Sequence, residues 1–115
     1  MREIEFYRTA SGRCPVEEFL DTLSDKQAEK ILWVLRLVKS LDPVPRQYFK
    51  LLSDTDGIWE VRVKLGGDIF RLLGFFARPQ LIVLTHGFAK KTQKTSRKEI
   101  VIAQHRRKDY LERRN

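Results

Sequence analysis

Two arginines stand out as residues that could stabilise negative charge during a reaction. If the Gly66-Gly67 pair forms a two-residue turn between strands, counting outward places Arg62 directly opposite Arg71 on one face of the hairpin. Like charges directly across a strand pair repel each other and weaken the sheet. Three explanations stay open: an anion binds between the arginines, a carboxylate such as Glu60 offsets their charge, or the register differs. Glu60 itself could orient an arginine or accept a proton, or be an exposed strand charge paired with a neighbouring lysine.

The stretch from Thr85 to Ile100 offers a histidine and a group of cations. His86 lies at the predicted end of a buried strand, where its imidazole could transfer protons near neutral pH. Positive charge nearby would lower its pKa and favour the neutral base. The alternative is a structural histidine with a ring nitrogen hydrogen-bonded at the strand end. Five cations of this stretch precede its first acidic residue, Glu99: Lys90, Lys91, Lys94, Arg97 and Lys98.

The positive charge is concentrated towards the C-terminus. Residues 86–115 hold 10 Lys and Arg against 3 Asp and Glu, so this segment carries +7 of the formal net charge of +8. Such a field attracts polyanions. The alternative is a solvated basic helix that binds nothing, and contact with a membrane surface is less favoured because residues from Ser96 onward show no broad apolar face.

Composition excludes several other classes of protein. At 115 residues and 42% hydrophobic, the chain predicts one folded domain spanning residues 1–115. Its single cysteine, Cys14, allows no internal disulfide, and the sequence has no Cys/His cluster typical of a metal site. We recognise no signal peptide and no apolar run near the ~18 residues of a membrane span. These features predict a cytoplasmic protein without a Cys/His metal site.

The spacing of apolar residues predicts an α+β fold in the order β-α-α-β-β-β-α. Ser24 with Gln27, and Ser96 with Glu99, each match the capping box that begins a helix. Three closely spaced strand patterns with short turns predict antiparallel neighbours. The expected elements are a strand over 3–7, helices from residues 15 and 24, strands over 58–65, 68–77 and 80–88, and a helix over 96–112.

The segments "GIWEVRV", "FRLLGFF", "THGFAKKTQKTSRKEI" and "YLERR" resemble the HigB/RelE superfamily of bacterial toxins, in particular its phage-derived HigB-like branch. The resemblance covers nearly the whole chain and implies the RelE-like form of the predicted fold. It also implies the toxin of a type II toxin–antitoxin system that cleaves mRNA, usually on the translating ribosome, without metal or cofactor. The implied partner is a helix-turn-helix antitoxin encoded nearby.

The resemblance also implies roles for individual residues. Arg71 matches the strand arginine that RelE-type toxins use at the scissile phosphate, and Arg62 and His86 complete the expected catalytic group. Lys90 or Lys91 falls where the family carries a basic residue after its last strand, with Lys91 taken as the catalytic one. The expected RNA-binding residues are Lys50, in the segment before the hairpin, and Lys90, Lys94, Arg97 and Lys98.

Two points stay open. The chain has no tyrosine directly after the predicted last strand, so the identity of the general acid and base stays open. The function could instead be that of a non-catalytic nucleic-acid-binding module, or of an inactive toxin relic that binds only its antitoxin.

Overall fold

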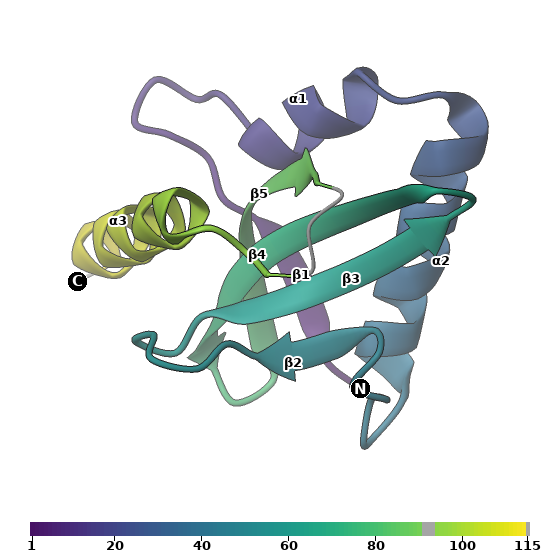
Figure 1. The fold of residues 1–115 in the computed structure, drawn as a ribbon. Helices are drawn as coiled ribbons and strands as arrows, with labels where there is room; N and C mark the ends of the chain where they lie inside the picture. Colours follow the sequence, from purple (N-terminus) through teal and green to yellow (C-terminus); the bar gives the residue numbers. More distant parts are fainter. Residues whose placement is uncertain (91–93, 115) are drawn as a thin grey trace.

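The fold is a five-stranded sheet with helices on both faces (Figure 1). The computed structural model describes residues 1–90 and 94–114. It confirms the predicted α+β order and adds a short strand, β2, in the segment before the hairpin. In chain order the elements are β1 (Glu3–Phe6), α1 (Pro15–Asp21), α2 (Asp25–Ser40), β2 (Phe49–Leu51), β3 (Trp59–Leu65), β4 (Asp68–Arg78), β5 (Leu81–Ala89) and α3 (Arg97–Arg113).

The strands lie in the order β1-β5-β4-β3-β2, with β1 parallel to β5 and every other pair antiparallel. The register predicted for the β3–β4 hairpin is confirmed, because Arg62 pairs with Arg71 and Leu65 pairs with Asp68. Gly66 has a φ of 61° in the turn, a conformation that glycine adopts without steric cost. This register puts the two arginines on the same face of the sheet.

Helices α1 and α2 cover one face and bury the larger core. Val34 and Val38 of α2 are fully buried in a cluster that includes Val61 and Leu84 of the sheet. The predicted capping box of α2 is confirmed: the Gln27 backbone N–H donates to Ser24 Oγ at 3.2 Å, and the Gln27 side chain accepts from the Ser24 backbone at 2.9 Å. These two helices therefore hold the sheet from one side only.

Helix α3 covers the opposite face of the sheet. Ala103 packs with Ile58 and Leu73, and Tyr110 packs edge-on against Phe75. The second predicted capping box is wrong: Ser96 is the N-cap residue, but its side chain makes no capping hydrogen bond. Within the described ranges, no helix is long and apolar enough to cross a membrane.

A bulge in β5 decides which way its polar residues point. Leu73 pairs with His86 but the next residue, Gly74, pairs with Leu84, so Thr85 is an extra residue on β5. Strict alternation would put His86 on the side of Leu84, towards the larger core. The extra residue reverses the alternation, so His86 lies on the α3 side and Gly87 faces α1. A Cβ on Gly87 would lie 2.4 Å from the ring of Phe19 in α1, which agrees with that orientation.

Candidate functional site

A buried ion pair lies at the centre of the α3 side of the sheet. The Arg71 side chain is 0% exposed and the Glu60 side chain 2% exposed, and Arg71 Nε lies 3.9 Å from Glu60 Oε2. Thr95, in the segment before α3, connects them: its hydroxyl donates to Glu60 Oε2 and accepts from Arg71 Nη1 at 3.3 Å. Since buried charges are costly unless paired and hydrogen-bonded, this arrangement is what keeps Arg71 inside the protein.

These contacts decide between the explanations for the facing arginines. The register is the expected one, so a register error is excluded. Glu60 lies on β3 two residues before Arg62 and is the diagonal neighbour of Arg71. Its carboxylate offsets the charge of Arg71, so no bound anion is needed for Arg71 to be buried. The interpretation of Glu60 as an exposed strand charge is wrong, because α3 and the segment before it cover that face.

The histidine belongs to a second polar group between β5 and α3. His86 Nε2 lies 3.1 Å from Glu99 Oε1, and His86 Nδ1 lies 3.0 Å from Thr85 Oγ1. Because a carboxylate only accepts hydrogen bonds, Nε2 carries the proton that points to Glu99. Glu99 therefore contacts the strand in place of completing the helix cap. Arg106 of α3 donates to the carbonyl oxygen of Thr85 at 3.2 Å and closes the group.

The pKa of His86 is lowered from its ordinary value of 6.5. Burial of the ring is the main cause, since it disfavours the charged form. The positive charge of Arg106 also lowers the pKa, whereas the hydrogen bond and charge of Glu99 oppose the shift. The neutral imidazole is thus favoured at neutral pH, as expected for a base, although only 7% of the residue is exposed.

The two groups are neighbours on one face of the sheet. Arg71 pairs with Phe88 and Leu73 pairs with His86, so the arginine and the histidine are diagonal neighbours on adjacent strands. Arg62 of β3 is the register partner of Arg71 of β4. The Arg62 residue is half-buried, whereas Arg71 is fully buried. The structure therefore brings three of the four expected catalytic residues to the same face, and the fourth, Lys91, lies outside the described residues.

The expected RNA-binding cations have different surroundings. Lys50 of β2 pairs with Glu60 of β3, so it borders the buried ion pair and is half-buried. Lys90 is half-buried, and its backbone N–H donates to the Ile69 carbonyl at 3.1 Å. Three cations at the start of α3 are exposed: Lys94, Arg97 and Lys98.

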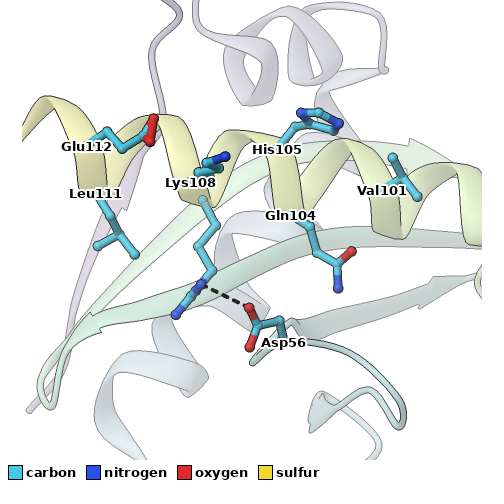
Figure 2. A pocket seen from close by; sticks show the side chains of 8 residues that line it. Asp56, Val101, Gln104, His105, Lys108, Leu111 and Glu112 are labelled. Atoms are coloured by element: carbon cyan, nitrogen blue, oxygen red, sulfur yellow. Dashed lines mark ion pairs between the residues drawn. The ribbon is translucent and has the colours of Figure 1, made fainter.

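Several cations further along α3 are already neutralised within the protein. Arg113 pairs with Asp109 at 2.7 Å, and Arg114 pairs with Glu5 at 2.8 Å. Arg107 Nη1 lies 3.5 Å from Asp56 in a cavity of about 590 Å³ beside α3, where Figure 2 marks the ion pair. The basic composition of the C-terminal segment therefore overstates the charge that α3 presents to a polyanion.

Sequence reasoning missed the partners of the expected site residues. Thr85, Thr95 and Glu99 were not distinguishable from ordinary strand and cap residues, because their roles depend on contacts with distant elements. The available signal was the facing arginine pair, which already required a carboxylate or an anion nearby. Among residues 1–90 and 94–114, no group of three or more His, Cys, Asp or Glu is placed to hold a metal ion.

Comparison with known families agrees with this architecture. Residues 18–108 match the family described as phage-derived protein Gp49-like (DUF891). The chain belongs to this family. The Gp49-like family is one of RelE/HigB-type toxins, so membership implies a toxin of a toxin–antitoxin system and, with it, an antitoxin partner. A search of curated proteins found no match to the chain.

Proposed function

We propose that this Gp49-like chain is an endoribonuclease that cleaves mRNA, on the translating ribosome, as the toxin of a type II toxin–antitoxin system of the HigB branch. Family membership supports the toxin class. The observation that carries the reaction is the meeting of Arg62, Arg71 and His86 on one face of the sheet. The proposal includes a helix-turn-helix antitoxin encoded nearby as the partner that silences the activity.

Cleavage of RNA without a metal requires three things from the protein. The ribose 2′-oxygen loses a proton and attacks the adjacent phosphorus, the pentacoordinate transition state gains negative charge, and the leaving 5′-oxygen receives a proton. The products are a 2′,3′-cyclic phosphate and a free 5′-hydroxyl. Fixed cations beside the phosphate supply the charge stabilisation, which is commonly the largest contribution of an enzyme site.

Arg62 is the arginine that we assign to the phosphate. It is held on a rigid strand, its planar guanidinium suits two phosphate oxygens, and it is more accessible than Arg71. Arg71 has no exposed surface, so we assign it a positioning role through its contacts with Glu60 and Thr95.

The His86–Glu99 pair is our candidate for proton transfer. Glu99 is more exposed than the histidine, with side-chain exposures of 17% and 9%, and it shares the Nε2 proton of His86. A carboxylate and an imidazole that share a proton can accept one from the 2′-hydroxyl and return one to the leaving oxygen. The half-buried Lys90 and the exposed cations Lys94, Arg97 and Lys98, together with Lys50 and Lys91, are proposed to bind the surrounding RNA.

The test is translation of a defined messenger in a cell-free extract, with cut sites mapped by primer extension. We expect discrete cuts that require ribosomes with the native chain, and a loss of cutting of at least about 100-fold with Arg62→Gln or His86→Gln. Arg36→Gln is the matched control, since Arg36 is an exposed arginine on α2. A well-folded native protein that binds RNA but cuts nothing would contradict the enzyme and leave the non-catalytic module.

Arg71→Ala needs a folding measurement beside the cleavage assay. Removing the arginine leaves Glu60 buried without its partner, so we expect a loss of roughly 3–5 kcal/mol in the free energy of unfolding. The double variant Glu60→Gln/Arg71→Met removes both charges and should recover much of that loss. If it folds and still cuts at the native rate, the positioning role of Arg71 is wrong.

A further inference from the structure

A cavity lies at the outer edge of β3, beside α2 and the start of β2. It has a volume of about 320 Å³ and is lined by Lys30, Gln47, Tyr48, Arg62 and Lys64. Three of these residues are cations and none is acidic. Strand β2 pairs only with Trp59–Val61, and the Arg62 backbone N–H donates to the Tyr48 carbonyl just beyond it. Past Arg62 the β2 segment no longer borders β3, and Lys30 of α2 lines the cavity together with Arg62 and Lys64.

The two lysines of this cavity are not neutralised by the protein. Within the described ranges, neither Lys30 nor Lys64 forms an ion pair with a carboxylate, unlike Arg107, Arg113 and Arg114 of α3. Three cations around one cavity repel one another, and a bound anion removes that repulsion. The lining is thus suited to a phosphate or another compact anion.

Aromatic side chains adjoin the cations. Trp33 is 40% exposed, its ring lies 4.5 Å from Lys30 Nζ, and it packs edge-on against Tyr48 with ring centroids 6.2 Å apart. Tyr48 in turn is fixed beside β3, because its carbonyl accepts from the Arg62 backbone N–H at 2.9 Å. An exposed indole beside a cationic cavity is the combination that binds a single-stranded nucleotide, with the base stacked and the phosphate held by charge.

We propose that this cavity is a nucleotide subsite, which binds one phosphate of single-stranded RNA while Trp33 stacks on an adjoining base. The inference rests on the proposed function, because Arg62 belongs to both the cavity and the candidate cleavage face. A strand of RNA that crosses Arg62 would leave the cleavage face around the edge of β3 and place a flanking nucleotide in this subsite. Gln47 adds an amide that can hydrogen-bond a base edge.

RNA accounts for the lining better than an acidic peptide does. Carboxylates of a peptide would be satisfied by the lysines alone. The partly exposed Trp33 ring and the guanidinium of Arg62 are planar groups that match a base and two phosphate oxygens.

The test follows the indole N–H signals of Trp33 and Trp59 by NMR while a single-stranded oligouridylate of about eight nucleotides is added. Trp59 serves as the internal reference, since it is stacked on Phe49 with centroids 4.7 Å apart. We expect the Trp33 signal to shift and the Trp59 signal to stay. The affinity is measured in parallel by fluorescence anisotropy between about 50 and 200 mM salt.

The variant Lys30→Gln/Lys64→Gln should bind the oligonucleotide several-fold more weakly and reduce the slope of log K against log salt by about 0.7–1.4. The matched control is Lys26→Gln/Lys39→Gln, two exposed lysines of α2, which should keep the native slope. If the native protein binds and cleaves RNA but the Trp33 signal does not shift, the subsite is wrong and the proposed function is unaffected. If the native protein neither binds nor cleaves RNA, the nucleotide subsite and the proposed function are both wrong.

A short oligoglutamate peptide is added as a separate probe. If the peptide shifts the Trp33 signal and the oligouridylate does not, the cavity takes protein carboxylates and the nucleotide subsite is wrong. If the oligouridylate alone shifts it, the assignment is supported.

Discussion

At the scale of residues, the site depends on charges that are held inside the protein. Arg71 and Glu60 are both almost fully enclosed, and each would be costly to bury without the other. His86 is buried, and burial lowers its pKa and favours the neutral form. Both of its ring nitrogens lie within hydrogen-bonding distance of a side chain, Thr85 and Glu99. The buried His86 also holds the more exposed Glu99, since Nε2 lies 3.1 Å from Glu99 Oε1.

The buried histidine predicts a pH dependence of stability. Its pKa is lowered on folding, so as pH falls the unfolded chain takes up a proton before the folded protein does. The stabilisation is complete above the ordinary pKa of 6.5 and is lost as pH falls from there towards the lowered folded value. One proton limits the slope to about 1.4 kcal/mol per pH unit.

The measurement is urea denaturation of the native chain and of His86→Gln, between about pH 7.5 and 5.5. Groups that do not contact His86 titrate equally in both proteins, so the stability advantage of the native chain should shrink as the pH falls. A constant difference over this range would show that His86 does not titrate differently in the two states.

At the scale of elements, the start of α3 is held by tertiary contacts rather than by its own cap. Ser96 Oγ is buried and makes no hydrogen bond within the described structure, and Glu99 contacts His86. Helix α2 differs, because Ser24 and Gln27 cap each other within one turn. The bulge at Thr85 has a comparable effect on β5, since it turns His86 towards α3.

The two N-cap serines therefore predict unequal effects of the same substitution. Ser24→Ala removes a hydrogen bond to the Gln27 backbone, and we expect a loss of about 1 kcal/mol in the free energy of unfolding. Ser96→Ala removes a hydroxyl that makes no capping hydrogen bond, and we expect the free energy of unfolding to change by no more than about 0.5 kcal/mol. Urea denaturation of both variants tests this; similar losses would mean that Ser96 caps α3 in solution.

At the scale of the whole molecule, the net charge of +8 is not uniformly available to a partner. Cations at the C-terminal end of α3 are paired with Asp109 and Glu5, whereas Arg97 and Lys98 at its start are exposed. Arg97, Lys98 and the cavity at the β3 edge therefore place accessible positive charge beside the candidate cleavage face.

This distribution predicts which cations contribute to RNA binding. Arg97→Gln/Lys98→Gln should weaken binding of a single-stranded RNA and reduce the slope of log K against log salt by about 1.4. Arg113→Gln/Arg114→Gln removes the same formal charge from internally paired positions, so its slope should stay near the native value. Anisotropy titrations over a range of salt concentrations measure both slopes. Equal slopes for the two variants would contradict the difference between exposed and internally paired cations.

Local sequence determined much of the fold. The spacing of apolar residues predicted the order of helices and strands, since core-facing positions repeat with the period of each element. The Gly66-Gly67 turn set the register that pairs Arg62 with Arg71, because a two-residue turn leaves only one way to count outward. The Ser24 cap was equally predictable, since it lies within one turn of helix.

Tertiary structure alone decided the rest of the site. The short strand β2, the bulge at Thr85 and the capture of Glu99 by His86 all depend on segments that are distant along the chain. Whether Glu60 is exposed or buried depends on α3 covering the sheet, which no local pattern contains. The physical reason is that periodicity reports which face a residue shares with its neighbours in sequence, whereas its charge partners are set by packing between elements.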